Sequence, residues 1–138
     1  MANDYNGGKM ADTEKITINM SVVDLGQVDL LVQEGFYSNR TDFIRTAIRN
    51  LLNTHAEKVK ELVAKKSMVV GVISFNRKDL EEIRSKGVKL EIKALGLCFL
   101  ADDISPDLAL STISSLEVMG VLRASNVVKE ALGKRIKQ

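Results

Sequence analysis

Apolar and polar residues alternate over residues 15–20, and this period of two predicts a short β-strand. Its two faces differ in polarity: one carries Ile16, Ile18 and Met20, and the other carries Lys15, Thr17 and Asn19. A lone strand cannot bury its apolar face within so short a unit. The simplest partner is the same strand of a second copy of the chain.

The period then changes to that of helices. Ser21 is placed as an N-cap, apolar residues follow at helical spacing, and Gly35 is a fitting C-terminal stop. Asn39 is the expected N-cap of a second helix, with Asp42 in its first turn. The apolar positions of this second helix are Phe43, Ile44, Ala47, Ile48, Leu51 and Leu52. Its pattern extends toward Val63.

The second half alternates between strand and helix patterns. Residues 68–75 and 88–100 read as strands, with a charged helix over 77–86 between them. Ser105 and Pro106 open a further helix, which we expect to run through Met119 and to stop at Gly120. A short strand at 121–122 and a final helix capped by Ser125 complete the prediction.

These elements predict an α+β fold in distinct parts. Residues 1–13 read as a flexible lead, 14–55 as a strand-helix-helix unit, and 56–67 as a helical extension or linker. Residues 68–138 read as a small C-terminal α/β domain for oligomerisation or effector binding.

Composition narrows the function classes. The 138-residue chain is 45% hydrophobic but only 4% aromatic, which disfavours single-strand binding by base stacking. Its net charge is +2, so any basic surface depends on where the charges are placed. No segment approaches the roughly 20 apolar residues of a membrane span, and no signal-like run begins the chain, so we expect a soluble cytoplasmic protein.

Candidate chemistry is sparse. A zinc site of the usual Cys/His kind cannot be built within one chain that has only Cys98 and His55. No nucleophile and base can be assembled around His55, so we expect no enzyme, cofactor or metal. Asp102, Asp103 and Asp107 could attract a cation, but we favour their complementing a helix dipole. Cys98 reads as a buried core thiol.

The strand from Lys15, the Gly35 turn and the segment Ser38-Asn-Arg-Thr-Asp-Phe resemble the ribbon-helix-helix DNA-binding family. CopG-type repressors and the DNA-binding half of the nickel-responsive regulator are especially similar, over residues 14–55. The resemblance implies an intertwined homodimer whose paired strands enter the major groove of double-stranded operator DNA. The nickel regulator also has a C-terminal ACT-type sensor that joins dimers into a tetramer, so the resemblance adds an ACT-like domain and a tetramer as possibilities. The sensor's histidines are absent here.

The resemblance also implies site residues. Lys15, Thr17 and Asn19 fall on the base-reading positions, and their side chains suit base edges. The backbone amides that anchor phosphate in the family map onto the start of the second helix, at Asn39, Arg40 and Thr41.

Arg45 and Arg49 lie four residues apart on the second helix. They could reach phosphate or pair with Asp42 and other acids, and the pairing is favoured slightly. Lys65 and Lys66 read as a solvated linker.

The function expected is a sequence-specific transcriptional regulator, most simply a repressor. One alternative is an antitoxin whose C-terminal half binds a toxin. Another is a sensor-regulator that responds to an unknown small-molecule effector.

Overall fold

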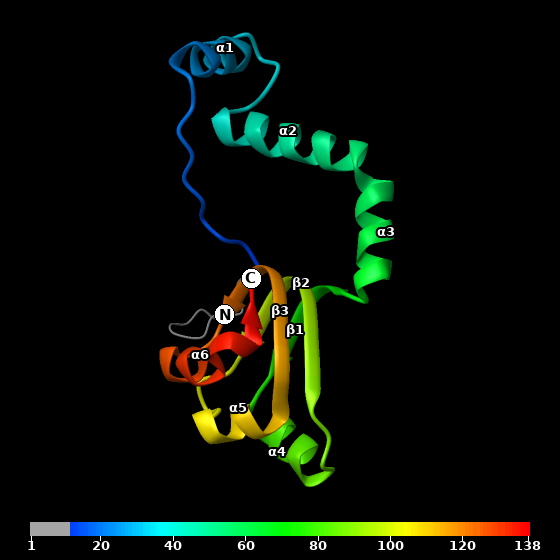
Figure 1. The fold of residues 1–138 in the computed structure, drawn as a ribbon. Coiled ribbons are helices and arrows are strands. Elements are labelled where there is room, and N and C mark those ends of the chain that lie inside the picture. The colour runs from blue at the N-terminus through cyan, green and yellow to red at the C-terminus, as the bar shows by residue number, and fades with distance from the viewer. Residues whose placement is uncertain (1–11) are drawn as a thin grey trace. The chain divides into compact units, whose positions relative to one another are not determined.

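The computed structural model describes residues 12–138, and the chain forms two compact units (Figure 1). The helical unit is Lys15–Leu62. The sheet unit is Val63–Gln138 together with residues 12–14. Most of the expected flexible lead, residues 1–11, lies outside the described residues.

The helical unit contains α1 (Val22–Gln33), α2 (Arg40–Thr54) and the first part of α3 (Ala56–Lys66). The two caps predicted for this unit are confirmed. The side chain of Ser21 accepts a hydrogen bond from the amide of Asp24, and that of Asn39 accepts one from the amide of Asp42. Gly35 adopts a φ of +86° just after α1, where a left-handed residue ends the helix. The extension of α2 is a separate helix, because α2 ends at Thr54 and His55 forms a turn before α3 begins at Ala56.

Residues 13–20 belong to no helix or strand in the single chain. Ile16 is 74% exposed and Ile18 is 66% exposed, so neither apolar side chain is buried within the helical unit. A strand is defined by hydrogen bonds to a neighbouring strand, and the expected neighbour belongs to a second copy. The ribbon strand therefore stays a prediction.

The sheet unit is a four-stranded parallel sheet in which helices connect the strands (Figure 1). Its elements, in chain order, are β1 (Val69–Phe75), α4 (Arg77–Ser85), β2 (Leu90–Leu100), α5 (Pro106–Thr112), β3 (Ile113–Arg123), α6 (Asn126–Leu132), a 3₁₀ turn (Gly133–Arg135) and β4 (Ile136–Lys137). Spatial order follows chain order, β1-β2-β3-β4.

One apolar core lies between the sheet and its helices. Leu80 of α4, Leu108 of α5 and Val128 of α6 pack with inward side chains of β2 and β3. Cys98 is fully buried in this core, as expected, and burial raises the pKa of its thiol to about 11. The thiol therefore stays protonated at neutral pH and acts as a small apolar group.

The predicted helix over 105–119 is wrong in its second half. The helix α5 ends at Thr112, and β3 begins at Ile113. Leu116, Val118 and Leu122 are buried at alternate positions, which is the period of a strand. The C-terminal strand β4 was not expected.

The ACT-like expectation is also wrong for the described residues. An ACT-like domain has the ferredoxin-like order β-α-β-β-α-β, in which two strands follow each other directly. Here a helix separates every pair of consecutive strands, and all the pairings are parallel.

A row of three glycines crosses the sheet. Gly71 pairs in register with Gly96, and Gly96 pairs with Gly120. Their φ angles are +122°, +137° and +121°. Residues other than glycine rarely adopt this backbone conformation. A Cβ on Gly96 would overlap the carbonyl oxygen of Gly71, and one on Gly120 would overlap that of Gly96. The close backbone approach therefore requires glycine at both positions.

A pair of alanine substitutions separates backbone strain from this overlap. Gly71→Ala adds a Cβ with open space around it, so it should cost only the strain of a positive φ, about 1–3 kcal/mol. Gly96→Ala should lower the free energy of unfolding further, because its Cβ also meets backbone. Denaturant unfolding of the two variants measures the difference, and equal losses would show that the overlap relaxes freely.

Candidate nucleic-acid interface

The start of α2 presents unpaired backbone amides. The side-chain oxygen of Asn39 accepts a hydrogen bond from the amide of Asp42 at 2.7 Å, and the carboxylate of Asp42 accepts one from the amide of Ser38 at 2.9 Å. This arrangement leaves the amides of Arg40 and Thr41 without an acceptor among the described residues. The positive end of the helix dipole and these amides together favour an anion.

A bidentate ion pair joins α1 to α2. The Nε and Nη2 atoms of Arg40 each donate to one carboxylate oxygen of Asp29 at 2.8 Å. The hydrogen bond from Arg40 lowers the pKa of Asp29, and the same bond raises the pKa of Arg40. Both side chains are about half exposed, so the pair fixes geometry more than it adds stability. The guanidinium of Arg40 is therefore committed within the unit, and its amide is the group left for phosphate.

The turn between the helices is held by an aromatic pair. The rings of Tyr37 and Phe43 meet edge to face, with their centroids 5.0 Å apart and their planes at 83°. This contact joins the turn before α2 to the first turn of the helix itself. It helps to fix the direction in which the free amides of α2 point.

Arg45 and Arg49 belong to the same hollow as the α2 N-terminus. A cavity of about 380 Å³ is lined by Ser38, Asn39, Thr41, Asp42, Arg45 and Arg49. The favoured expectation that the two arginines pair with acids is wrong, since neither forms an ion pair within the described residues. The carboxylate of Asp42 is bonded to the amide of Ser38 instead. Two arginines thus line a hollow at the positive end of a helix, which suits a phosphate.

The sequence contained a signal for this arrangement. Thr41, Arg45 and Arg49 are spaced by four residues, so they form one row along a helix. Asp42 lies near this row in the sequence, but its carboxylate accepts a hydrogen bond from the backbone amide of Ser38 and pairs with neither arginine.

The proposed base-reading residues Lys15, Thr17 and Asn19 are all exposed. No described side chain covers them. Their common face in a paired ribbon stays a prediction.

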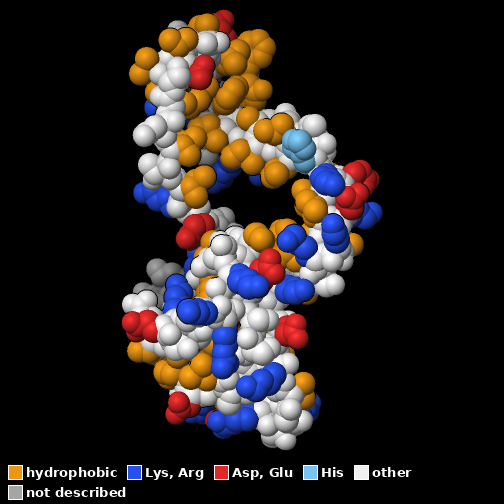
Figure 2. Space-filling view, viewed as in Figure 1, with side chains coloured by type: hydrophobic (Ala, Val, Ile, Leu, Met, Phe, Trp, Pro, Cys, Tyr) orange, Lys and Arg blue, Asp and Glu red, His pale blue; other side chains and the backbone are white. Residues whose placement is uncertain are grey.

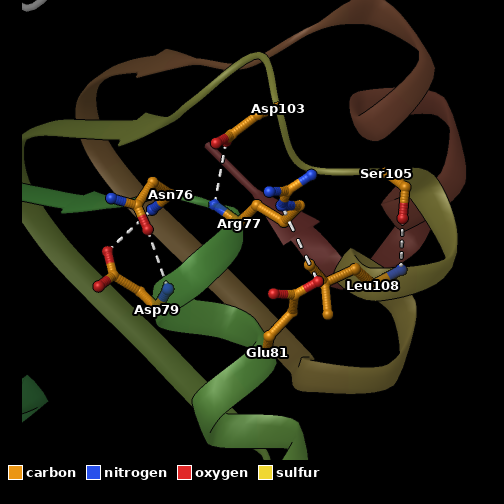
Figure 3. A network of polar contacts seen from close by, with 7 residues as sticks. All are labelled: Asn76, Arg77, Asp79, Glu81, Asp103, Ser105 and Leu108. Carbon is orange, nitrogen blue, oxygen red and sulfur yellow. Dashed lines mark hydrogen bonds and ion pairs between the residues drawn. The ribbon is translucent and has the colours of Figure 1, made fainter.

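Two acidic residues of the sheet unit, Asp79 and Asp103, bind backbone amides at the start of α4 (Figure 3). Asp103 accepts a hydrogen bond from the amide of Arg77 at 3.0 Å, at the first residue of α4. Asn76 and Asp79 form a reciprocal capping box at the same end. Asp103 thus complements the dipole of a helix, as expected, but the helix is α4 and not the helix that follows Asp103 in the sequence. No cluster of His, Cys, Asp and Glu suited to a metal ion occurs in residues 12–138.

A pair of capped helices preceded by an alternating segment is the arrangement expected of a ribbon-helix-helix protein. The model of the Ribbon-Helix-Helix transcriptional regulator family matches residues 11–129. The chain belongs to this family, and its members are DNA-binding transcriptional regulators, typically without enzymatic activity. The match extends well beyond the resemblance at residues 14–55 and takes in the sheet unit as far as α6.

Two other comparisons found no relative. No curated protein and no solved structure matches the chain. Among the described helices, none is long and apolar enough to cross a bilayer.

Replacing both arginines of the hollow tests its role. In Arg45→Gln/Arg49→Gln, affinity for duplex DNA of any sequence should fall, because each protomer of a bound dimer loses two phosphate contacts. The slope of log affinity against log salt should shrink by about 3.6 for the four contacts of the dimer, at about 0.9 per contact. Lys65→Gln/Lys66→Gln removes the same charge from the end of α3 and should change the slope little. Equal salt slopes for the two double variants would show that Arg45 and Arg49 do not contact DNA phosphates.

Proposed function

We propose that the protein is a sequence-specific repressor that dimerises and reads the major groove with a two-stranded ribbon. The observation that carries the proposal is the apolar surface of the helical unit. Val28 is the only buried residue described in it. Large apolar side chains elsewhere in the unit stay exposed: Ile16, Ile18, Met20, Val22, Val23, Leu30, Phe36, Ile48, Leu51, Leu52, Val59 and Leu62.

Figure 2 shows apolar side chains gathered over the visible faces of α1 and α2. Monomeric proteins rarely expose large contiguous apolar patches. Intertwining with a second copy would bury these side chains. The same step would pair residues 15–20 with their equivalents and satisfy their backbone groups.

The polar face of that ribbon suits base edges. Lys15 can donate to the O6 and N7 acceptors of guanine, and Asn19 can pair bidentately with adenine. Thr17 can form a hydrogen bond or touch a thymine methyl group. The two-fold symmetry of the dimer would present each side chain twice, so we infer a palindromic operator.

The start of α2 would hold the phosphate backbone. The amides of Asn39, Arg40 and Thr41 lie at the start of α2, where the helix dipole is positive, and Arg45 and Arg49 add two charges to the lining of the same hollow. Phosphate contacts of this kind set the register of the protein on DNA and carry no sequence information. Recognition of the DNA sequence would therefore depend on the ribbon alone.

The sheet unit supports an oligomerisation or effector role over toxin binding. It folds around its own continuous core, whereas a toxin-binding tail would be short and would order on its partner. Parallel sheets usually have both faces covered, yet Val70 is 65% and Met119 is 43% exposed on the face away from the helices. A tetramer of two dimers would cover the part of that face around Val70 and Met119. The repressor assignment rests on the resemblance to CopG-type repressors.

A triple substitution tests the reading edge. Lys15→Ala/Thr17→Ala/Asn19→Ala should keep the fold and the dimer, because all three side chains are exposed and the apolar face is untouched. Specific binding to fragments selected from genomic DNA should fall to the level of nonspecific binding, which is typically 10³-fold weaker or more. Undiminished preference for the selected fragments would refute the ribbon assignment. Glu34→Ala, on the cap residue after α1, serves as a surface control.

A further inference from the structure

The sheet unit contains a cavity that DNA binding does not use. It has a volume of about 300 Å³, which is at the lower end for small-molecule sites. Its lining is Asp12, Thr13, Glu14, Gly71, Val72, Gly96, Leu97, Val121 and Arg123, and we call it the glycine cavity. Val72, Leu97 and Val121 are partners in one register row, which lies on the sheet face away from the helices. They form an apolar floor beside two glycine backbones.

Arg123 is the one cation among the described residues that line this cavity. Its side chain is 18% exposed, and its Nη2 atom lies 2.7 Å from a carboxylate oxygen of Glu14. The same Nη2 donates to the carbonyl oxygen of Thr13 at 3.2 Å. Glu14 is 53% exposed, so water and salt weaken its hold on the guanidinium. Another carboxylate can therefore replace Glu14 as the partner of Arg123 at little cost in free energy.

This contact sits where the chain changes units. Glu14 is the last residue of the N-terminal stretch of the sheet unit, and Lys15 is the first residue of the helical unit. The chain returns to the sheet unit at Val63. The helical unit is thus an insertion attached at two ends, and the Glu14–Arg123 pair fastens the end that adjoins the ribbon segment.

We propose that the glycine cavity binds a small monocarboxylate with an apolar tail, which takes the place of Glu14 on Arg123. The planar guanidinium fork matches a carboxylate, and the tail would lie on Val72, Leu97 and Val121. Asp12 and Glu14 also line the cavity and repel an anion, so the ligand competes with the chain's own carboxylate. Its entry frees the segment before Lys15 from the sheet unit. This last step rests on the proposed function, because it makes the ligand an effector of DNA binding.

Calorimetry of the full chain with octanoate, without DNA, tests the site. Glu14→Gln removes the competitor, so it should bind octanoate several-fold more tightly than the unaltered protein. Arg123→Gln should lose binding. Val72→Trp, which fills the apolar floor at a 49% exposed position and keeps Arg123, should lose it too. Glu130→Gln, an exposed carboxylate on α6 outside the cavity, is the matched control and should match the unaltered protein.

Two results would overturn the site. One is equal or undetectable octanoate binding by Glu14→Gln and the unaltered protein. The other is saturable binding of octylamine that Glu14→Gln abolishes, which would assign the cavity to a cation.

Measurements of DNA affinity test the ligand site and the proposed function separately. Saturating octanoate should shift the DNA affinity of the unaltered protein, and Glu14→Gln without octanoate should already show the shifted value. Unchanged affinity would overturn the coupling. An unaltered protein that binds no DNA but does bind octanoate would overturn the proposed function and leave the site intact.

Discussion

The shortage of buried apolar surface in residues 15–62 governs the rest of the account. Burial of apolar area contributes about 25 cal/mol per Å², and it is the main term that offsets the loss of chain entropy on folding. A unit in which Val28 alone is buried gains little of this. Its capped helices are well specified locally, but local specification does not supply a core. A second copy would supply the core, and the ribbon, the two-fold symmetry and the doubled reading edge follow from that one requirement.

The sheet unit solves the same problem within one chain. Helices α4, α5 and α6 cover one face of the parallel sheet, and β2 and β3 supply most of the core residues beneath them. The glycine row lets neighbouring backbones approach closely, and two of its glycines line a cavity on the other face. Because the family match covers both units, a self-sufficient sheet unit and an incomplete helical unit belong to one architecture. This division suits a regulator in which one part reads DNA and the other assembles or senses.

Local signals in the sequence predicted local structure well. Side-chain caps at Ser21, Asn39, Ser105 and Ser125 are all confirmed, since each satisfies an amide in the first turn of its own helix. A cap needs only residues three positions apart, so one sequence is enough to find it. The family was also recognisable from residues 14–55, because the order of alternating segment, capped helices and glycine turn is encoded locally.

Features that depend on distant segments were missed. Gly120 read as a helix stop, but its role comes from register with Gly96 on another strand. Leu108 and Leu116 share an apolar face at helical spacing, so the strand from Ile113 could not be told from a helix by period alone. In the candidate site, Arg45 and Arg49 were given to acidic partners because the sequence does not show that Asp42 already bonds the amide of Ser38. The pairing of β4 with β3 joins residues far apart along the chain.

The most direct test is whether the helical unit folds only in a dimer. Sedimentation equilibrium of the full chain should give at least twice the 15.2 kDa monomer mass at micromolar concentration, and four times that mass where two dimers associate. The midpoint of thermal unfolding of α1 and α2 should rise with protein concentration, because association and folding are then one equilibrium. A stable 15.2 kDa monomer whose helical unit unfolds cooperatively, with a midpoint independent of concentration, would contradict the account.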